Sequence, residues 1–299
     1  MNRFTFIFIV CLYALFIVYQ ANSVINLESQ IIYSSFFILL FGIPHGAIDH
    51  ILFFRKKHMS QIQFYSLYLG LIGVFAVSWI FFPITSFVFF LVLSAFHFGE
   101  SQFVDSNISL WKYKPILFLF WGLSLLATLM YYNFGELAAI TKIFKDTQGL
   151  SPVYNPVVIF LFFVFTNFTS TALIVYLYLK KHITAKRFTS ELFLILLIHL
   201  TFFLFPFIIG FTLYFVVLHS IRVMSQEYLF FKKENKDFSV RAFIKMLLPY
   251  SLLSIFGTTA LMLLSHYGFL NISIPLLSII IISVVTLPHA IVMHIFYNK

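Results

Sequence analysis

Ten apolar stretches, most of them close to 20 residues long, follow one another along the chain. A stretch of this length can cross a bilayer as a helix, which satisfies its own backbone hydrogen bonds. We place the stretches at about residues 4–22, 31–54, 62–82, 84–101, 115–133, 156–179, 189–205, 207–222, 243–265 and 272–296. The sequence therefore predicts an all-α, polytopic membrane helix bundle of about ten transmembrane helices (eight at the fewest), forming a single integral-membrane domain over residues 1–299.

The composition excludes the soluble classes of protein. Hydrophobic residues make up 61% of the chain and charged residues only 10%, whereas a soluble domain carries roughly 25% charged residues. A disordered chain is excluded for the same reason, since it would be polar and highly charged. Cys11 is the one cysteine, so neither a disulfide framework nor a cysteine-based metal site can form.

Two prolines divide what would otherwise be longer apolar runs. Pro83 follows Phe82 between the third and fourth stretches, and Pro206 follows Phe205 between the seventh and eighth. Proline cannot donate a backbone hydrogen bond and clashes with the preceding turn, so each predicts a helix end or a sharp bend. The alternative at either place is one long, kinked helix.

The basic residues predict the orientation of the spans. With the N-terminus placed in the cytoplasm, all but two of the 19 basic residues fall on the cytoplasmic side, the exceptions being Lys142 and Lys145. This distribution predicts a protein of the cell inner (plasma) membrane with both termini cytoplasmic, and it explains the net charge of +9 without a nucleic-acid partner. The longest polar segments are 223–242, expected inside, and 134–155, expected outside.

The first stretch has two interpretations. Arg3, a long apolar run and then Ala21-Asn22-Ser23 fit a signal peptide, but the run is long for one, which favours a retained membrane anchor. Either interpretation leaves the rest of the topology unchanged.

Ionisable residues within the spans are costly and indicate function. Spans two, four, eight and ten all run from outside to inside, and each carries histidine toward its cytoplasmic end. Helices in a bundle can bring such residues to one point, and the candidate metal ligands are His45, His97, His219 and His289. Neutral imidazole suits iron, zinc, copper and nickel. A redox-active iron that binds O2 would fit apolar walls and an apolar substrate that enters from the bilayer.

Two carboxylates accompany these histidines. Asp49 lies four residues after His45 and Glu100 three residues after His97, so each shares a helix face with its histidine and is a candidate to orient the imidazole. Alternatively, Asp49 pairs with the basic cluster that begins at Arg55, and Glu100 is interfacial.

Other histidines and glycines have simpler interpretations. His199 lies in the middle of the seventh span and is expected to be structural, the alternative being a fifth polar residue that lines the site. Three more histidines fall at loops or span ends and are expected to be solvated: His58, His182 and His266. Small residues flank the candidate ligands, where they suit either close helix approach or ordinary packing: Gly42, Gly46 and Gly99.

Four short segments around these histidines form a recognisable set. They are Pro44-His45-Gly46-Ala47-Ile48-Asp49, His97-Phe98-Gly99, His219-Ser220 with Arg222, and Pro288-His289. In this order, on separate spans and over nearly the whole chain, they resemble the Brp/Blh family of bacterial and archaeal membrane β-carotene 15,15'-dioxygenases. No single segment is specific, but the ordered set is.

The resemblance implies a multi-span enzyme with a histidine-ligated, non-haem Fe(2+). It implies O2-dependent cleavage of the central 15,15' double bond of β-carotene into two molecules of all-trans-retinal. By motif, His45, His97 and His219 match family iron ligands. The family pattern has a further histidine where this chain has Val223. The candidates for the fourth ligand are His289, which we include in the metal site, and His50 or Glu227.

The resemblance also implies partners. β-Carotene and O2 are the expected substrates, membrane lipid surrounds the bundle, and the retinal product is expected to pass to a rhodopsin. Asp49 and Glu100 are expected to support the site from behind the ligands.

The sequence also allows three alternatives. The chain could cleave another carotenoid or be an inactive member of the family. It could instead be a transporter or channel that uses its histidines as a relay, although their crowding into the cytoplasmic halves does not trace a path across the bilayer. A histidine-box di-iron desaturase fits less well, because the clustered boxes of that class do not occur here.

Overall fold

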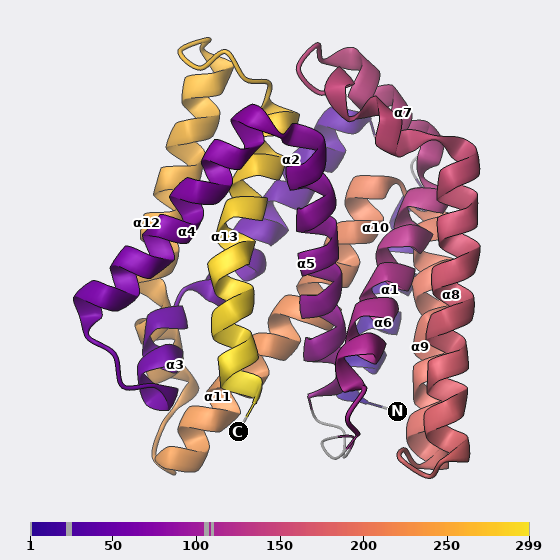
Figure 1. Ribbon diagram of the computed structural model, residues 1–299, viewed down its shortest axis with the longest axis vertical. Coiled ribbons are helices and arrows are strands. Elements are labelled where there is room, and N and C mark those ends of the chain that lie inside the picture. Colours follow the sequence, from indigo (N-terminus) through magenta and orange to yellow (C-terminus); the bar gives the residue numbers. More distant parts are fainter. Residues whose placement is uncertain (1, 22–25, 105–107, 109–110, 299) are drawn as a thin grey trace. The chain divides into compact units, whose positions relative to one another are not determined.

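The computed structural model describes residues 2–21, 26–104, 108 and 111–298, and no strand occurs among them (Figure 1). Ten helical segments of this part are long and apolar enough to cross a membrane. They confirm the predicted number of spans, and the chain is a multi-pass membrane protein. The segments are Arg3–Gln20, Leu27–Lys56, Gln61–Phe81, Pro83–Phe103, Lys114–Tyr132, Pro156–Leu179, Ala185–Leu204, Phe207–Glu234, Val240–His266 and Ile274–Tyr297.

Both prolines separate helices, as predicted. Helix α4 (Gln61–Phe81) ends just before Phe82, and α5 (Pro83–Phe103) begins at the proline itself. A proline at the first helical position loses nothing, since the N–H it lacks has no partner there. Pro206 likewise stands between α9 (Ala185–Leu204) and α10 (Phe207–Leu213). The alternative of long, kinked helices is wrong at both places.

The eighth span is longer than its apolar run. Helix α10 continues through a π-helical segment, η5 (Tyr214–Ser220), into α11 (Ile221–Glu234). Much of the polar segment 223–242 is therefore helix. The reason is that α11 buries one face, with Val223, Glu227 and Phe231 at successive steps of four residues.

The segment expected outside, residues 134–155, also has structure. It holds a short helix, α7 (Phe134–Ile143), and a 3₁₀ segment, η4 (Gln148–Tyr154). These two elements pack against each other, and η4 also packs against α5.

The chain divides into two compact units. Unit 1 comprises Met1–Ile48 and Thr171–Ile255, and unit 2 comprises Asp49–Ser170 and Phe256–Lys299. Two helices contribute residues to both units, α8 (Pro156–Leu179) and α12 (Val240–His266). The single domain expected over residues 1–299 stays a prediction.

Unit 1 is organised around the eighth span. Helix α10 packs against α2 (Leu27–Phe37) and α9, and η5 packs against α1 (Arg3–Ala21). The side chain of Arg3 at the start of α1 donates a 2.7 Å hydrogen bond to the Ser225 hydroxyl on α11. These contacts tie the first span to the helix that carries His219.

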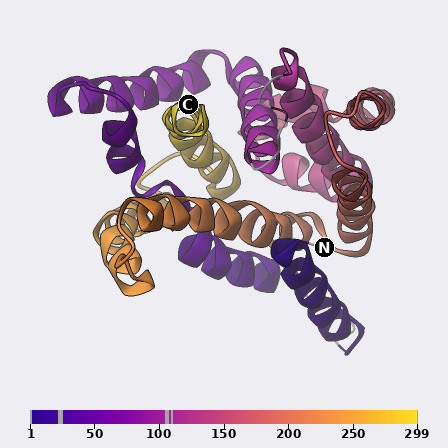
Figure 2. The ribbon, with the colours of Figure 1, turned by 90° about the horizontal axis from the view of Figure 1, so that it is seen from below.

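Unit 2 is organised around its last helix. Helix α13 (Ile274–Tyr297) packs against α3 (Asp49–Lys56), α4 and α5, which lie around it when it is viewed nearly along its axis (Figure 2). The Trp79 indole on α4 donates a 2.8 Å hydrogen bond to the Ser283 hydroxyl on α13. This bond satisfies the polar edge of a buried ring inside an apolar cluster. The cluster comprises Phe75, Trp79, Phe87, Leu150 and Val284.

Helices α5 and α6 (Lys114–Tyr132) approach each other more closely than side chains would allow. A Cβ atom at Gly99 would overlap the carbonyl group of Phe118, and one at Gly122 would overlap the carbonyl group of Ala95. Backbone therefore faces backbone at both points, as in the small-residue contacts of membrane helices. Gly99 stands two residues after His97, so this contact fixes the part of α5 that presents the histidine.

Candidate functional site

The second span leaves regular α-helical geometry where it carries His45. A π-helical segment, η1 (Ile38–Gly42), is followed by a 3₁₀ segment, η2 (Ile43–Gly46), before α3 begins at Asp49. Pro44 explains the break, because it cannot donate to the helical hydrogen-bond ladder. Such irregular turns frequently occur at functional sites.

The break brings the His45 ring against a backbone carbonyl group. Its Nδ1 atom lies against the carbonyl oxygen of Gly42. A carbonyl oxygen only accepts, so Nδ1 carries the proton and donates it. In the neutral ring, Nε2 then carries the lone pair that a metal would need.

Unit 1 places a second histidine beside the first. His219 belongs to η5, another π-helical segment, and η5 packs against η1. The ring centroids of His45 and His219 are 5.1 Å apart, and both residues are buried. Phe215 contacts both rings, with centroids 5.5 Å from each. The second and eighth spans thus meet in one apolar, aromatic setting.

Unit 2 contains an equivalent pair. His97 on α5 and His289 on α13 have ring centroids 4.9 Å apart. Only 2% of His97 and 4% of His289 is exposed. Burying imidazole is costly unless its polar atoms are engaged.

Asp49 engages one nitrogen of His289. Its two carboxylate oxygens lie 2.9 and 3.1 Å from His289 Nδ1. The Tyr68 hydroxyl on α4 donates a 2.9 Å hydrogen bond to the same carboxylate. Asp49 is itself buried, and an ionised carboxylate only accepts. His289 therefore donates from Nδ1, which leaves Nε2 as its lone-pair nitrogen.

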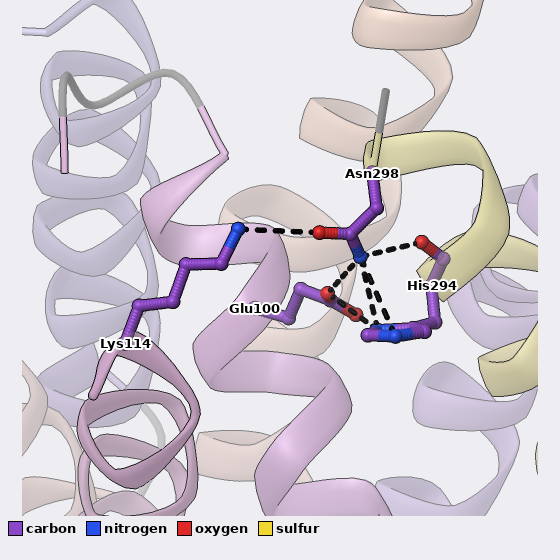
Figure 3. A network of polar contacts seen from close by, with 4 residues as sticks. All are labelled: Glu100, Lys114, His294 and Asn298. Carbon is purple, nitrogen blue, oxygen red and sulfur yellow. Dashed lines mark hydrogen bonds and ion pairs between the residues drawn. The ribbon is translucent and has the colours of Figure 1, made fainter. Parts of the chain in front are cut away.

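Glu100 forms a separate polar network at the end of the same helices (Figure 3). Its carboxylate accepts a 2.8 Å hydrogen bond from His294 Nδ1 and a 3.3 Å hydrogen bond from the Asn298 amide. Asn298 in turn accepts a 3.2 Å hydrogen bond from the Lys114 ammonium group at the start of α6. Half of the His294 side chain is exposed, whereas that of Glu100 is buried. The network ties the C-terminal end of α13 to α5 and α6.

The structure thus unites the predicted ligands in two pairs, His45 with His219 and His97 with His289. The two carboxylates, however, contact imidazoles other than those of the histidines that precede them in their own spans. Asp49 was a candidate to orient His45 or to pair near Arg55, and the imidazole it contacts within unit 2 is His289. Glu100 was expected to orient His97, and the imidazole it contacts is His294.

The alternatives for the fourth ligand are placed as follows. His50 packs its ring 6.2 Å from that of Tyr65. Val223 and Glu227 are both fully buried on α11, which packs against η2. Glu227 lies on a helix that continues past the eighth apolar run.

Sequence reasoning missed Tyr68 and Asn298. Tyr68 is one of 16 tyrosines in an aromatic-rich chain. Its own position in the sequence carries no signal, because its partner Asp49 is 19 residues away.

The donor chemistry of these residues fits a metal. A ligating histidine usually donates its other ring nitrogen to a carboxylate or a backbone carbonyl, which fixes the tautomer and the ring orientation. His289 has the first kind of partner and His45 the second. Imidazole ligands with apolar surroundings suit iron among other metals.

The fold and these residues define a multi-pass membrane protein that buries two histidine pairs in its spans. The family model for β-carotene 15,15'-dioxygenase matches residues 36–297, and the chain belongs to that family. No curated protein and no solved structure matches the chain. The match begins before Pro44 and ends after His289, so it includes all four motif segments.

Proposed function

We propose that the protein is an iron-dependent dioxygenase that cleaves the central 15,15' double bond of β-carotene into two molecules of all-trans-retinal. His45, His97, His219 and His289 are the proposed Fe(2+) ligands. The observation that carries the proposal is the partner at Nδ1 of His45 and of His289, a backbone carbonyl group and a carboxylate, because metal-ligating histidines usually have such partners. Family membership supplies the reaction and the substrate class.

The reaction itself explains why the site has histidines but few acids. Cleavage of one carbon–carbon double bond by O2 forms two carbonyl groups, with one oxygen atom in each. No proton enters or leaves, so no general acid or base is needed. Bound iron would supply O2 binding and activation. The carboxylates would instead orient imidazoles: Asp49 orients His289, and Glu100 orients His294.

The surroundings of the histidines suit an apolar substrate. The proposed ligands are buried in spans rich in phenylalanine, and Phe215 lies against two of them. Apolar walls of this kind exclude water from reactive oxygen species. A carotenoid dissolved in the bilayer would reach such a site laterally. Selectivity for the central bond would come from positioning the long substrate so that only its middle reaches the iron.

The proposal extends to location and product. The basic residues support an inner-membrane location with cytoplasmic termini. Retinal leaves as an apolar aldehyde, and a rhodopsin that binds it is the proposed recipient.

Production of the protein in a β-carotene-accumulating bacterium tests the activity. We expect the yellow colour to fade and all-trans-retinal to appear, both measured in cell extracts, with the protein quantified in the membrane. A carotenoid with a different ring structure, supplied in a parallel strain, tests the substrate preference. Unchanged β-carotene with the protein present in the membrane would contradict the proposal, and cleavage of the other carotenoid alone would reassign the substrate.

A further inference from the structure

In unit 2, hydrogen bonds link three residues in a row, and the last of the three is a proposed metal ligand. Tyr68 on α4 donates to Asp49 at the start of α3, and Asp49 accepts from His289 on α13. Three separate helices therefore contribute one residue each. Asp49 and Tyr68 lie on the Nδ1 side of the His289 ring, and the nitrogen that would bind a metal, Nε2, is the other one.

We propose that Tyr68 is a positioning residue that, through Asp49, sets the orientation of His289 and its strength as a metal ligand. The inference rests on the proposed function, since it requires iron on His289. It adds to that function a residue that acts through Asp49.

The geometry of the carboxylate supports this role. Both Asp49 oxygens lie within hydrogen-bonding distance of His289 Nδ1, at 2.9 and 3.1 Å, and one of them also accepts from Tyr68. Asp49 could not keep this two-oxygen contact if its carboxylate rotated freely. The Tyr68 hydroxyl restrains that rotation, because it holds one oxygen at 2.9 Å.

Tyr68 also adjusts how strongly Asp49 attracts the imidazole proton. A hydrogen bond to a carboxylate withdraws part of its negative charge and makes it a weaker acceptor. Asp49 is buried, so water does not readily replace that bond. Without the hydroxyl, Asp49 would draw the His289 proton more strongly, and Nε2 would become a better donor to iron. A better donor stabilises ferric iron more than ferrous iron and lowers the reduction potential.

The two positions therefore predict opposite effects. Tyr68→Phe strengthens the acceptor behind His289, and Asp49→Asn weakens it. In the iron-loaded protein we expect Tyr68→Phe to lower the Fe(III)/Fe(II) potential by about 59 mV, equivalent to a tenfold change in relative affinity for the two oxidation states. We expect Asp49→Asn to raise it and to weaken Fe(II) binding by about 10- to 100-fold.

Tyr65→Phe is the matched control. It makes the same substitution on the same helix, at a tyrosine that is 42% exposed and packs on His50. We expect its potential and Fe(II) affinity to equal those of the wild type. Phenylalanine keeps the ring volume at both positions, and elution of each detergent-solubilised variant as a single species verifies its folding.

The outcomes separate this inference from the function on which it rests. Wild-type protein that binds no iron would overturn both. Wild-type protein that binds iron, with a Tyr68→Phe potential equal to that of Tyr65→Phe, would overturn the role of Tyr68 alone. Potentials that shift in the same direction in Tyr68→Phe and Asp49→Asn would also overturn it. A hydrogen bond with a merely structural role gives no reason for the two potentials to shift in opposite directions.

Discussion

Alanine at His97 should abolish retinal formation and lower the iron content of the purified protein by more than about 100-fold. Removing a ligand lowers the metal affinity at least as much as removing a group that orients a ligand, and removing an orienting group already lowers it about 10- to 100-fold. His97 is almost fully buried and lies against His289, so no solvent-exposed side chain can readily take its place. The measurements are metal analysis of the purified protein and retinal in extracts of the producing cells.

His199→Ala is the matched control for this variant. His199 is also a histidine within a span, in α9, and it is not one of the proposed ligands. We expect its iron content and retinal yield to match the wild type. Full iron content and activity in His97→Ala would remove His97 from the site, and equal losses in both variants would indicate a general effect of changing intramembrane histidines.

Gly122→Ala should destabilise the protein by about 3 kcal/mol, the upper end of the usual cost of overpacking. The added methyl group would overlap the Ala95 carbonyl on the neighbouring helix, and backbone atoms cannot move aside as a side chain can. Helices α5 and α6 would have to separate. Because α5 carries His97 and Glu100, separation would also disturb the site. The measurement is the thermal stability of the detergent-solubilised protein.

Gly73→Ala provides the control for helix composition. Gly73 lies on α4, and a Cβ atom there meets nothing within 4 Å. Alanine favours helix by up to about 1 kcal/mol over glycine, so we expect unchanged or slightly higher stability. A Gly122→Ala protein as stable as Gly73→Ala would show that α5 and α6 do not approach as closely as described.

The number of spans was predictable because each apolar run is bounded by polar residues or by proline. Pro83 and Pro206 are local signals, and both separate helices as expected. The extension of α11 to Glu234 was not predicted, because its polar residues end the hydrophobic run without ending the helix. One buried face sustains a helix that hydrophobicity alone does not reveal.

The role of the four histidines as ligands stays a prediction, but the residues themselves were predictable as candidates, since ionisable residues within spans are rare. Their supporting contacts were not. Spacing along one helix assigned Asp49 to His45 and Glu100 to His97. Within unit 2 the carboxylates instead contact His289 and His294, which are 240 and 194 residues away. Periodicity describes neighbours on one helix and carries no information about pairs brought together by packing.

Cleavage of β-carotene by the purified, iron-loaded protein under isotopically heavy O2 tests the central claim most directly. The aldehydes are reduced at once to retinol, which prevents exchange of the label with water, and are analysed by mass spectrometry. A central-cleaving dioxygenase predicts retinol as the only cleavage product, with one heavy oxygen atom in every molecule. Products of unequal length, or retinol in which half of the molecules carry oxygen from water, would contradict it.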